Sequence, residues 1–76
     1  MEKVRVKVSY SGDNYGAVTE DERLCGFVVV TSSTYEELIK DLRDAICEYV
    51  KSLIADGDIV PEWLKEDKYD FDIERG

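Results

Sequence analysis

Hydrophobic and polar residues alternate along the first part of the chain, which predicts β-strands. Between Lys3 and Ser9 every second residue is a valine, and basic residues lie between the valines, a period of two that is typical of a half-buried strand. Residues 11–14, Ser-Gly-Asp-Asn, favour a turn, so residues 15–19 are expected to return as the second strand of a hairpin. Residues 24–31 are rich in β-branched side chains and predict a third strand.

A long amphipathic helix is predicted after the third strand. Between Tyr35 and Leu53, apolar residues recur at spacings of three and four, which places them along one face of a helix. Both Ser33–Glu36 and Thr34–Glu37 fit the capping box that satisfies the first amides of a helix. Gly57 is suited to end the helix, because glycine readily adopts the left-handed conformation that follows many helices.

The predicted helix is longer than the strands that it covers. A helix of about 22 residues spans roughly 33 Å, whereas a strand of about seven residues spans roughly 23 Å. We therefore expect a short helical turn at residues 61–65 to fold Trp63 and Leu64 onto the overhanging end of the helix. The alternation that returns at residues 69–74 predicts a fourth strand.

The charges of the first and fourth strands predict how the sheet is ordered. A strand–helix–strand crossover strongly favours a right-handed, parallel arrangement, so the fourth strand lies beside either the third or the first. The polar face of the first strand is basic, with Lys3, Arg5 and Lys7, and that of the fourth is acidic, with Asp70, Asp72 and Glu74. Opposite charges on neighbouring strands contribute about 0.2–1 kcal/mol per pair. We expect an α+β fold of order β-β-β-α-β, with a four-stranded mixed sheet ordered 3-2-1-4 and the long helix on one face.

The composition narrows the classes of function. The 76 residues include 18 acidic and 10 basic side chains, a net charge of −8, and no histidine. The lack of histidine excludes Ser-His and Cys-His catalysis and histidine-bound metals. The negative charge disfavours direct binding to nucleic acid, whose phosphates attract Lys and Arg, and favours basic partners. The two cysteines form neither a disulfide framework nor a four-ligand metal site.

No catalytic, cofactor-binding or metal-binding residues are expected. The carboxylates of the fourth strand lie in line opposite basic residues, rather than converging as metal-dependent nuclease chemistry requires. No apolar run approaches the ~18 residues of a membrane-spanning helix, and the first residues enter a strand pattern rather than a signal peptide. We expect one domain, residues 1–76, in the reduced cytoplasm and without enzymatic activity.

The order of elements, together with several short motifs, resembles the HicB-like antitoxin domain. The motifs are Val4–Val8, Tyr15–Val18, Cys25-Gly26-Phe27, Thr34–Leu38 followed by Asp44-Ala45-Ile46, and Ile59–Leu64. The resemblance implies a trimmed ribonuclease-H-like fold and a role in a toxin–antitoxin system, in which the domain masks a small basic HicA-like ribonuclease toxin. Many members of the family also carry a DNA-binding domain, and no such segment is expected in this sequence.

Two sets of residues are candidates for protein contacts. The partner-binding surface is expected to include Asp13, Glu20, Asp21, Glu22 and Phe27. The strand at residues 24–31 is apolar on both faces and lies at an edge of the predicted sheet. Such an edge favours homo-oligomer formation through this strand or the docking of a partner there. The oligomer interface is expected to include Cys25, Phe27 and Val29.

Two other functions stay open. The same fold could serve as an orphan oligomeric structural module without a toxin, or as a remnant of a divalent-metal-dependent nuclease. A short basic reading frame beside this one would favour the antitoxin, whereas saturable Mg²⁺ binding at carboxylate clusters would favour the nuclease.

Overall fold

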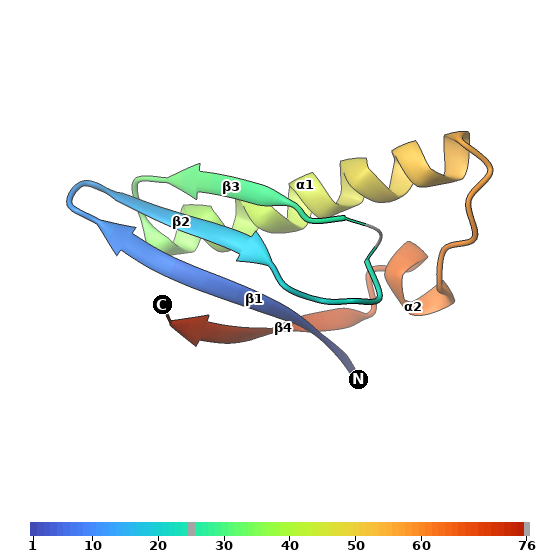
Figure 1. Cartoon of the computed structure of the whole chain (residues 1–76), viewed down its shortest axis with the longest axis horizontal. Helices are drawn as coiled ribbons and strands as arrows, with labels where there is room; N and C mark the ends of the chain where they lie inside the picture. Colours follow the sequence, from blue (N-terminus) through green and yellow to red (C-terminus); the bar gives the residue numbers. More distant parts are fainter. Residues whose placement is uncertain (25, 76) are drawn as a thin grey trace.

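A computed structural model describes residues 1–24 and 26–75 of the chain (Figure 1). The elements in chain order are β1 (Glu2–Ser11), β2 (Asn14–Thr19), β3 (Val29–Ser32), α1 (Tyr35–Ala55), α2 (Glu62–Lys65) and β4 (Tyr69–Arg75). The strands form one sheet in the order β3-β2-β1-β4, in which β1 pairs antiparallel with β2 and parallel with β4. This confirms the predicted α+β fold, its mixed sheet and its strand order. No helix among the described residues combines the length and the apolar character needed to cross a membrane.

The hairpin of β1 and β2 is closed by a two-residue turn. Ser11 pairs with Asn14, which leaves Gly12 and Asp13 between the strands. Gly12 has a φ of +64°, and a positive φ at the first turn residue alone is typical of the type II′ turn, which matches the twist of the flanking strands. A residue with a side chain would be strained at position 12.

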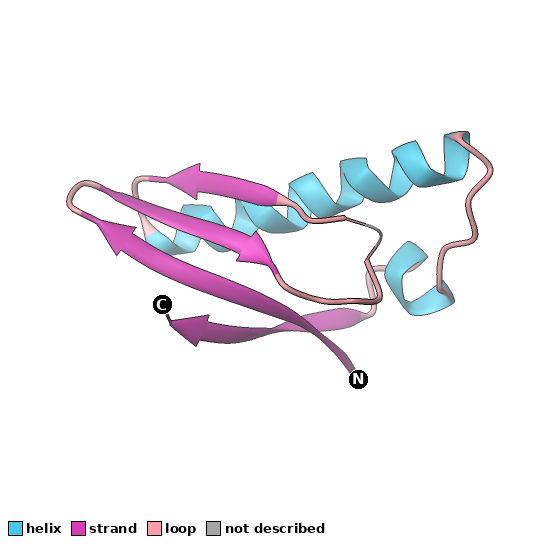
Figure 2. Cartoon of the chain, viewed as in Figure 1, coloured by secondary structure: helices cyan, strands magenta, loops and turns pink. Residues whose placement is uncertain are grey.

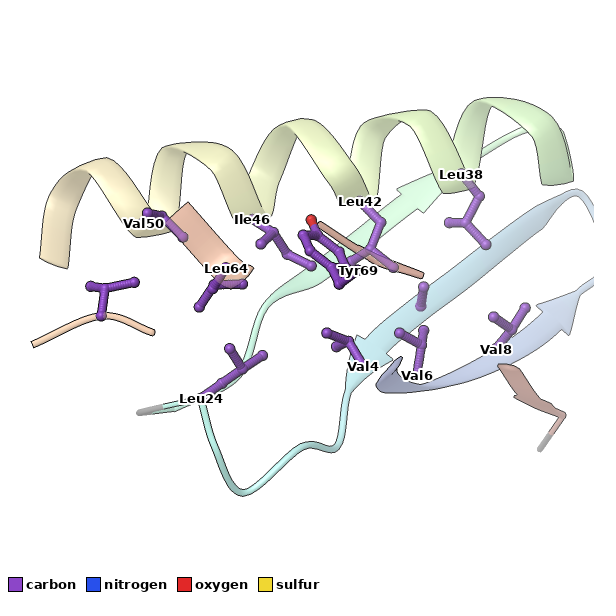
Figure 3. Packing of buried hydrophobic residues seen from close by; sticks show 12 residues of the cluster. Val4, Val6, Val8, Leu24, Leu38, Leu42, Ile46, Val50, Leu64 and Tyr69 are labelled. Carbon is purple, nitrogen blue, oxygen red and sulfur yellow. The ribbon is translucent and has the colours of Figure 1, made fainter. Parts of the chain in front are cut away.

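The core lies between one face of the sheet and one stripe of α1 (Figure 3). The buried residues of α1 recur with a regular helical spacing, and alternate residues of β1 face them. They are Leu38, Leu42, Ile46 and Val50 on α1 and Val4, Val6 and Val8 on β1. Because full burial of one such side chain contributes roughly 1.5–3 kcal/mol, this contact is the main source of stability.

Both ends of α1 are capped as the sequence predicts. The hydroxyl of Thr34 accepts a hydrogen bond of 3.2 Å from the backbone N–H of Glu37, which identifies Thr34 as the N-cap residue. At the other end Gly57 has a φ of +81°. Its N–H and the N–H that follows it donate to carbonyls in the last turn of α1, the hydrogen-bond pattern of a Schellman motif.

The C-terminal part of α1 projects beyond the sheet, as Figure 2 shows, and α2 lies beneath it. Leu64 of α2 is 4% exposed and belongs to the same buried cluster as Val50 of α1. Leu24 and Val60, from two loops on this side, complete the cluster. The expected short helical turn and the packing of Leu64 are therefore confirmed. Trp63 instead contacts Arg23 and Tyr69, and Ile54 in the last turn of α1 stays 51% exposed.

The third strand is shorter than the sequence predicts. The pattern predicts a strand over residues 24–31, whereas β3 covers Val29–Ser32. Gly26 has a φ of +109°, which interrupts an extended backbone, and Leu24 turns into the core, where it is 5% exposed. The expected strand was wrong in its first half, because the positive φ of Gly26 breaks the extended backbone and Leu24 packs beside Leu53 at the overhang of α1.

The charged faces of β1 and β4 lie in the predicted register. Three oppositely charged pairs are direct neighbours across the two strands: Lys3 with Asp70, Arg5 with Asp72, and Lys7 with Glu74. Among the described residues, none of these pairs approaches closely enough to form an ion pair. The charges complement one another at a distance, while burial of side chains such as Tyr69, 4% exposed, holds β4 against the core.

We predict that the charges of β1 and β4 contribute weakly to stability. Arg5→Gln and Asp72→Asn, combined in a double-mutant cycle, should give a coupling energy of about 0.2–0.5 kcal/mol that falls as salt is added. Free energies of unfolding in urea supply the measurement. The control pair Lys7→Gln and Asp70→Asn, which are not neighbours in this register, should show no coupling. A coupling above about 1.5 kcal/mol would mean that charge rather than burial holds the two strands together.

Candidate protein-binding surface

The face of the sheet turned away from α1, called the outer face, has no helix packed on it within the described residues. In β1 the residues between the buried valines are exposed, while the buried apolar residues of both helices belong to the core on the opposite face. The side chains on the outer face change from charged to apolar across the sheet. β4 carries carboxylates and β1 carries basic side chains, whereas β2 and β3 pair Val18 with Val29 and Gly16 with Thr31. Its β3 side is therefore its apolar side.

Three apolar side chains gather on the β3 side of the outer face. They are Val18, Phe27 and Val29, which together are named the Phe27 patch. Val18 is half-buried beside Val29, while Phe27 and Val29 are 71% and 58% exposed. Val18 and Val29 are neighbours across β2 and β3, and Phe27 precedes Val29 by two residues. Exposed apolar side chains that lie near one another on a small protein are typical of an interaction surface.

Acidic side chains border the Phe27 patch where β2 runs into the following loop. Thr19 donates its N–H to the carbonyl of Val28 at 3.0 Å, and its hydroxyl accepts a hydrogen bond of 2.8 Å from the N–H of Val28. Glu20 and Phe27 are the residues next to this bonded pair on the two segments. Glu20 and Glu22 are exposed, and neither forms an ion pair with a described residue. Glu20 also lies beside Arg5, whose carbonyl accepts the Glu20 N–H at 2.9 Å, and both carboxylates line one pocket with Lys3 and Arg5. The Phe27 patch thus has, at this end, carboxylates that form no ion pair within the described chain and that lie among basic side chains.

Asp21, between these two carboxylates, has a structural role instead. Its carboxylate accepts hydrogen bonds from Nε of Arg23 at 3.0 Å and from Nη2 of Arg23 at 2.8 Å, and the Asp21 side chain is 8% exposed. The Arg23 side chain lowers the pKa of Asp21 from 3.8 to about 2, because these hydrogen bonds stabilise the charged carboxylate. Of the candidate partner-binding residues, Asp21 is therefore occupied within the fold.

Arg23 joins three parts of the chain on this side of the sheet. Its Nη1 pairs with Oε1 of Glu2 at 2.6 Å, and its Nη2 donates to the backbone carbonyl of Lys3. The guanidinium carbon lies 4.6 Å from the ring centroid of Trp63, an arrangement typical of a cation–π interaction. The loop after β2 is thereby tied to the start of β1 and to α2, so its acidic residues extend from an anchored segment.

The remaining candidates lie in different places. Asp13 occupies the turn between β1 and β2, and the whole of β2 separates it from Glu20. At about 3.3 Å per residue the two lie roughly 23 Å apart along the chain, so Asp13 does not border the patch. Val29 lies in the patch with Phe27, and Cys25 lies outside the described residues.

Sequence reasoning missed two residues of this region. Val18 belongs to the patch because the strand register places it beside Val29, and the alternation of β2 contains that signal. Arg23 is the only basic residue in the run 20–23, where a neighbouring carboxylate is its natural partner. Its contacts with β1 and α2 have no signal in the local sequence.

Neither a metal site in the described part of the chain nor a known relative indicates the function of this chain, so the functional interpretation is based on the outer face. Among residues 1–24 and 26–75, no three or more histidine, cysteine, aspartate or glutamate side chains are grouped so that they could hold a metal ion. Comparisons with protein-family models, with curated proteins and with solved structures find no match to this chain. What the structure shows is an α+β layer with one open sheet face, an apolar patch on that face, and acidic side chains at its border.

We predict that the pair of Asp21 and Arg23 stabilises the fold in a pH-dependent way. A carboxyl group whose pKa is lowered on folding stabilises the folded state above its ordinary pKa, and this contribution is lost as the pH falls through the folded value. Asp21→Asn should therefore lower the free energy of unfolding by about 1–2 kcal/mol at neutral pH, a range that allows for solvent screening of Arg23. Unfolding in urea across a pH series measures the effect.

The pH range distinguishes this pair from other carboxylates. The difference between Asp21→Asn and the unmutated chain should shrink below pH 3.8 and be mostly lost by about pH 2. Glu22→Gln is the control, because Glu22 is exposed and unpaired among the described residues, and it should change stability little at any pH. A difference for Asp21→Asn that persists undiminished at the acid end would contradict the assigned ion pair.

Proposed function

We propose that this chain is a binding module for a small basic protein, which it contacts through the Phe27 patch and its acidic border. The observation that carries the proposal is Phe27 itself, an aromatic side chain that is 71% exposed on an uncovered sheet face. Aromatic residues are enriched at the centres of protein interfaces, where charged residues are depleted and the rim is polar. The Phe27 patch with Glu20 and Glu22 at its border has this arrangement.

Charge supports the choice of a basic partner. The net charge of −8 accelerates the encounter with a cationic surface through long-range attraction. At contact, Glu20 and Glu22 offer carboxylates to lysine and arginine side chains around a site that receives Phe27. A basic partner therefore gains both a buried aromatic contact and opposite charges at its edge.

The resemblance to the HicB-like antitoxin domain suggests what this partner is. We propose a small basic HicA-like ribonuclease toxin, bound in the cytoplasm, whose basic RNA-binding surface is covered by this chain. Inhibition by masking requires a complementary surface and no catalytic group, so the outer face alone is sufficient for the role.

The two alternative functions receive unequal support. An orphan oligomeric module is favoured by one observation, the end position of β3 in the sheet, where its second edge has no described partner. A nuclease remnant is favoured by none, since the carboxylates of β4 lie opposite the basic residues of β1. Pairing with a second copy through the edge of β3 and binding of a basic protein at the outer face use different groups. Oligomer formation is therefore compatible with the proposal, and the orphan module differs from it in having no basic partner.

We predict that Phe27 anchors the partner. Phe27→Ala should weaken the binding of a purified HicA-like ribonuclease by at least about tenfold, because a central aromatic anchor typically contributes about 2 kcal/mol or more. Isothermal titration calorimetry measures the affinity. Ile59→Ala is the matched control, since Ile59 is 99% exposed but lies in the loop between α1 and α2, and it should leave the affinity unchanged. Unaltered binding by Phe27→Ala would remove the outer face from the proposal.

The acidic border should act mainly on the association rate. Glu20→Lys combined with Glu22→Lys should slow association with the same ribonuclease by about tenfold at low salt and flatten its salt dependence. Asp44→Lys combined with Glu48→Lys makes the same change in net charge on exposed positions of α1, and should slow association far less. Stopped-flow fluorescence measures both rates. Equal slowing by the two double variants would show that only net charge matters and that the partner binds elsewhere.

A further inference from the structure

The sheet ends in two edge strands of different character. β4 (Tyr69–Arg75) carries four charged side chains in its 7 residues, and charges on an edge strand oppose pairing with another chain. β3 carries none, and residues 24–35 form the longest uncharged run of the sequence. No described strand pairs with the outer side of β3. β3 itself therefore carries no charge that would oppose pairing, although Asp41 of α1 lies close to its end and accepts a hydrogen bond of 2.6 Å from the Ser32 hydroxyl.

The hydrogen bonds between β2 and β3 show which backbone groups this edge offers. Thr19 donates to the carbonyl of Val28 at 3.0 Å, so Val28 directs its carbonyl toward β2, and every second residue of an antiparallel ladder does the same. Val29 and Thr31 therefore direct their N–H and carbonyl groups away from β2. Their side chains are exposed on the outer face, whereas Val30 packs against the core.

We infer that β3 pairs antiparallel with β3 of a second copy of this chain, which joins two four-stranded sheets into one. In the two-fold arrangement that uses the outward groups of β3, Val29 of one copy lies opposite Thr31 of the other, and the two Val30 residues meet at the axis. Each outward N–H then donates to an outward carbonyl of the other copy. Because the contact is isologous, it closes after two copies.

Charge favours a second copy over the basic partner at this edge. Two chains of net charge −8 repel each other, so they associate most easily where neither presents a charge. The uncharged residues 24–35 meet that condition, and the charged edge of β4 does not. A basic partner gains no electrostatic attraction from an uncharged edge and is drawn instead to the carboxylates of Glu20 and Glu22.

The dimer extends the plane of the sheet and leaves the outer face open. Residues that pair across antiparallel strands direct their side chains to the same face, so Val29 and Thr31 keep their positions on the outer face. The Phe27 patches of the two copies then lie on the same side of the joined sheet. The inference goes beyond the proposed partner binding and does not depend on it.

Sedimentation equilibrium of the full chain tests the dimer, under reducing conditions that prevent crosslinking through the exposed Cys47. We expect a monomer–dimer equilibrium whose dissociation constant falls as NaCl is raised from about 0.05 to about 0.5 M, because salt screens the repulsion between the two copies. Thr31→Pro removes one outward N–H and leaves the hydrogen bonds to β2 in place, so it should raise the dissociation constant by at least about tenfold. Thr31→Ala should leave it unchanged.

If circular dichroism shows that Thr31→Pro does not fold, a second variant tests whether the dimer forms through β3. Val29→Lys places a charge on the same edge at a side chain that is 58% exposed, and it should also raise the dissociation constant by at least about tenfold. Ile59→Lys adds the same charge at a distant exposed position and should not weaken the dimer.

Three outcomes would overturn the inference: a monomer at every salt and protein concentration, edge variants that dimerise like the unmutated chain, or a dimer that weakens as salt is added. Binding of a basic ribonuclease depends on salt in the opposite sense. The dimer and the proposed partner binding can therefore fail independently, and the two failures are distinguishable.

Discussion

One helix packs on one face of a four-stranded sheet, and the rest of the molecule follows from this constraint. The contact of Leu38, Leu42 and Ile46 on α1 with the valines of β1 forms the core. β1 lies inside the sheet, between β2 and β4, so the strand that faces the helix stripe also holds its two neighbours in place. Since the helix covers only one face, the opposite face stays open, and its side chains must suit either water or another protein.

The length of the helix is a second constraint, because its last turns extend beyond the strands. Leu24, from the loop that follows β2, and Leu64, from α2, cover that overhang. Arg23 holds these two segments in place through its ion pairs and its stacking on Trp63. The loop that contains Arg23 and Leu24 begins at Glu20, at the acidic border of the outer face, and leads to Phe27. The position of the candidate binding surface is therefore set by the packing of the overhang on the opposite side of the sheet.

The periodic parts of the fold could be predicted from the sequence. The alternation in β1 and the helical spacing in α1 show directly which residues of each element are buried. The complementary charges of β1 and β4 were sufficient to predict the strand order. The start of β3 could not be predicted, since the φ of Gly26 and the burial of Leu24 depend on contacts with distant segments. The same limit applies to the surface: Glu20 and Phe27 could be nominated by residue type, but their adjacency depends on strand register, and the structural role of Asp21 depends on the anchoring of Arg23.

The distribution of charge over the sheet suits one part of it to contact with a second copy of the chain and another part to contact with a basic protein. β1 and β4 carry opposite charges in register, so this half of the outer face is balanced within the chain. On the other half, the edge of β3 is uncharged, while the face beside it is bordered by carboxylates that no described cation pairs with. Neutral backbone groups in the plane of the sheet suit an identical copy, and an aromatic side chain with acidic neighbours suits a basic protein. The proposed edge pairing would bring two Phe27 patches to one side of the joined sheet. A basic partner that reached both patches would then be held by two linked contacts, which would raise its apparent affinity without any new interaction.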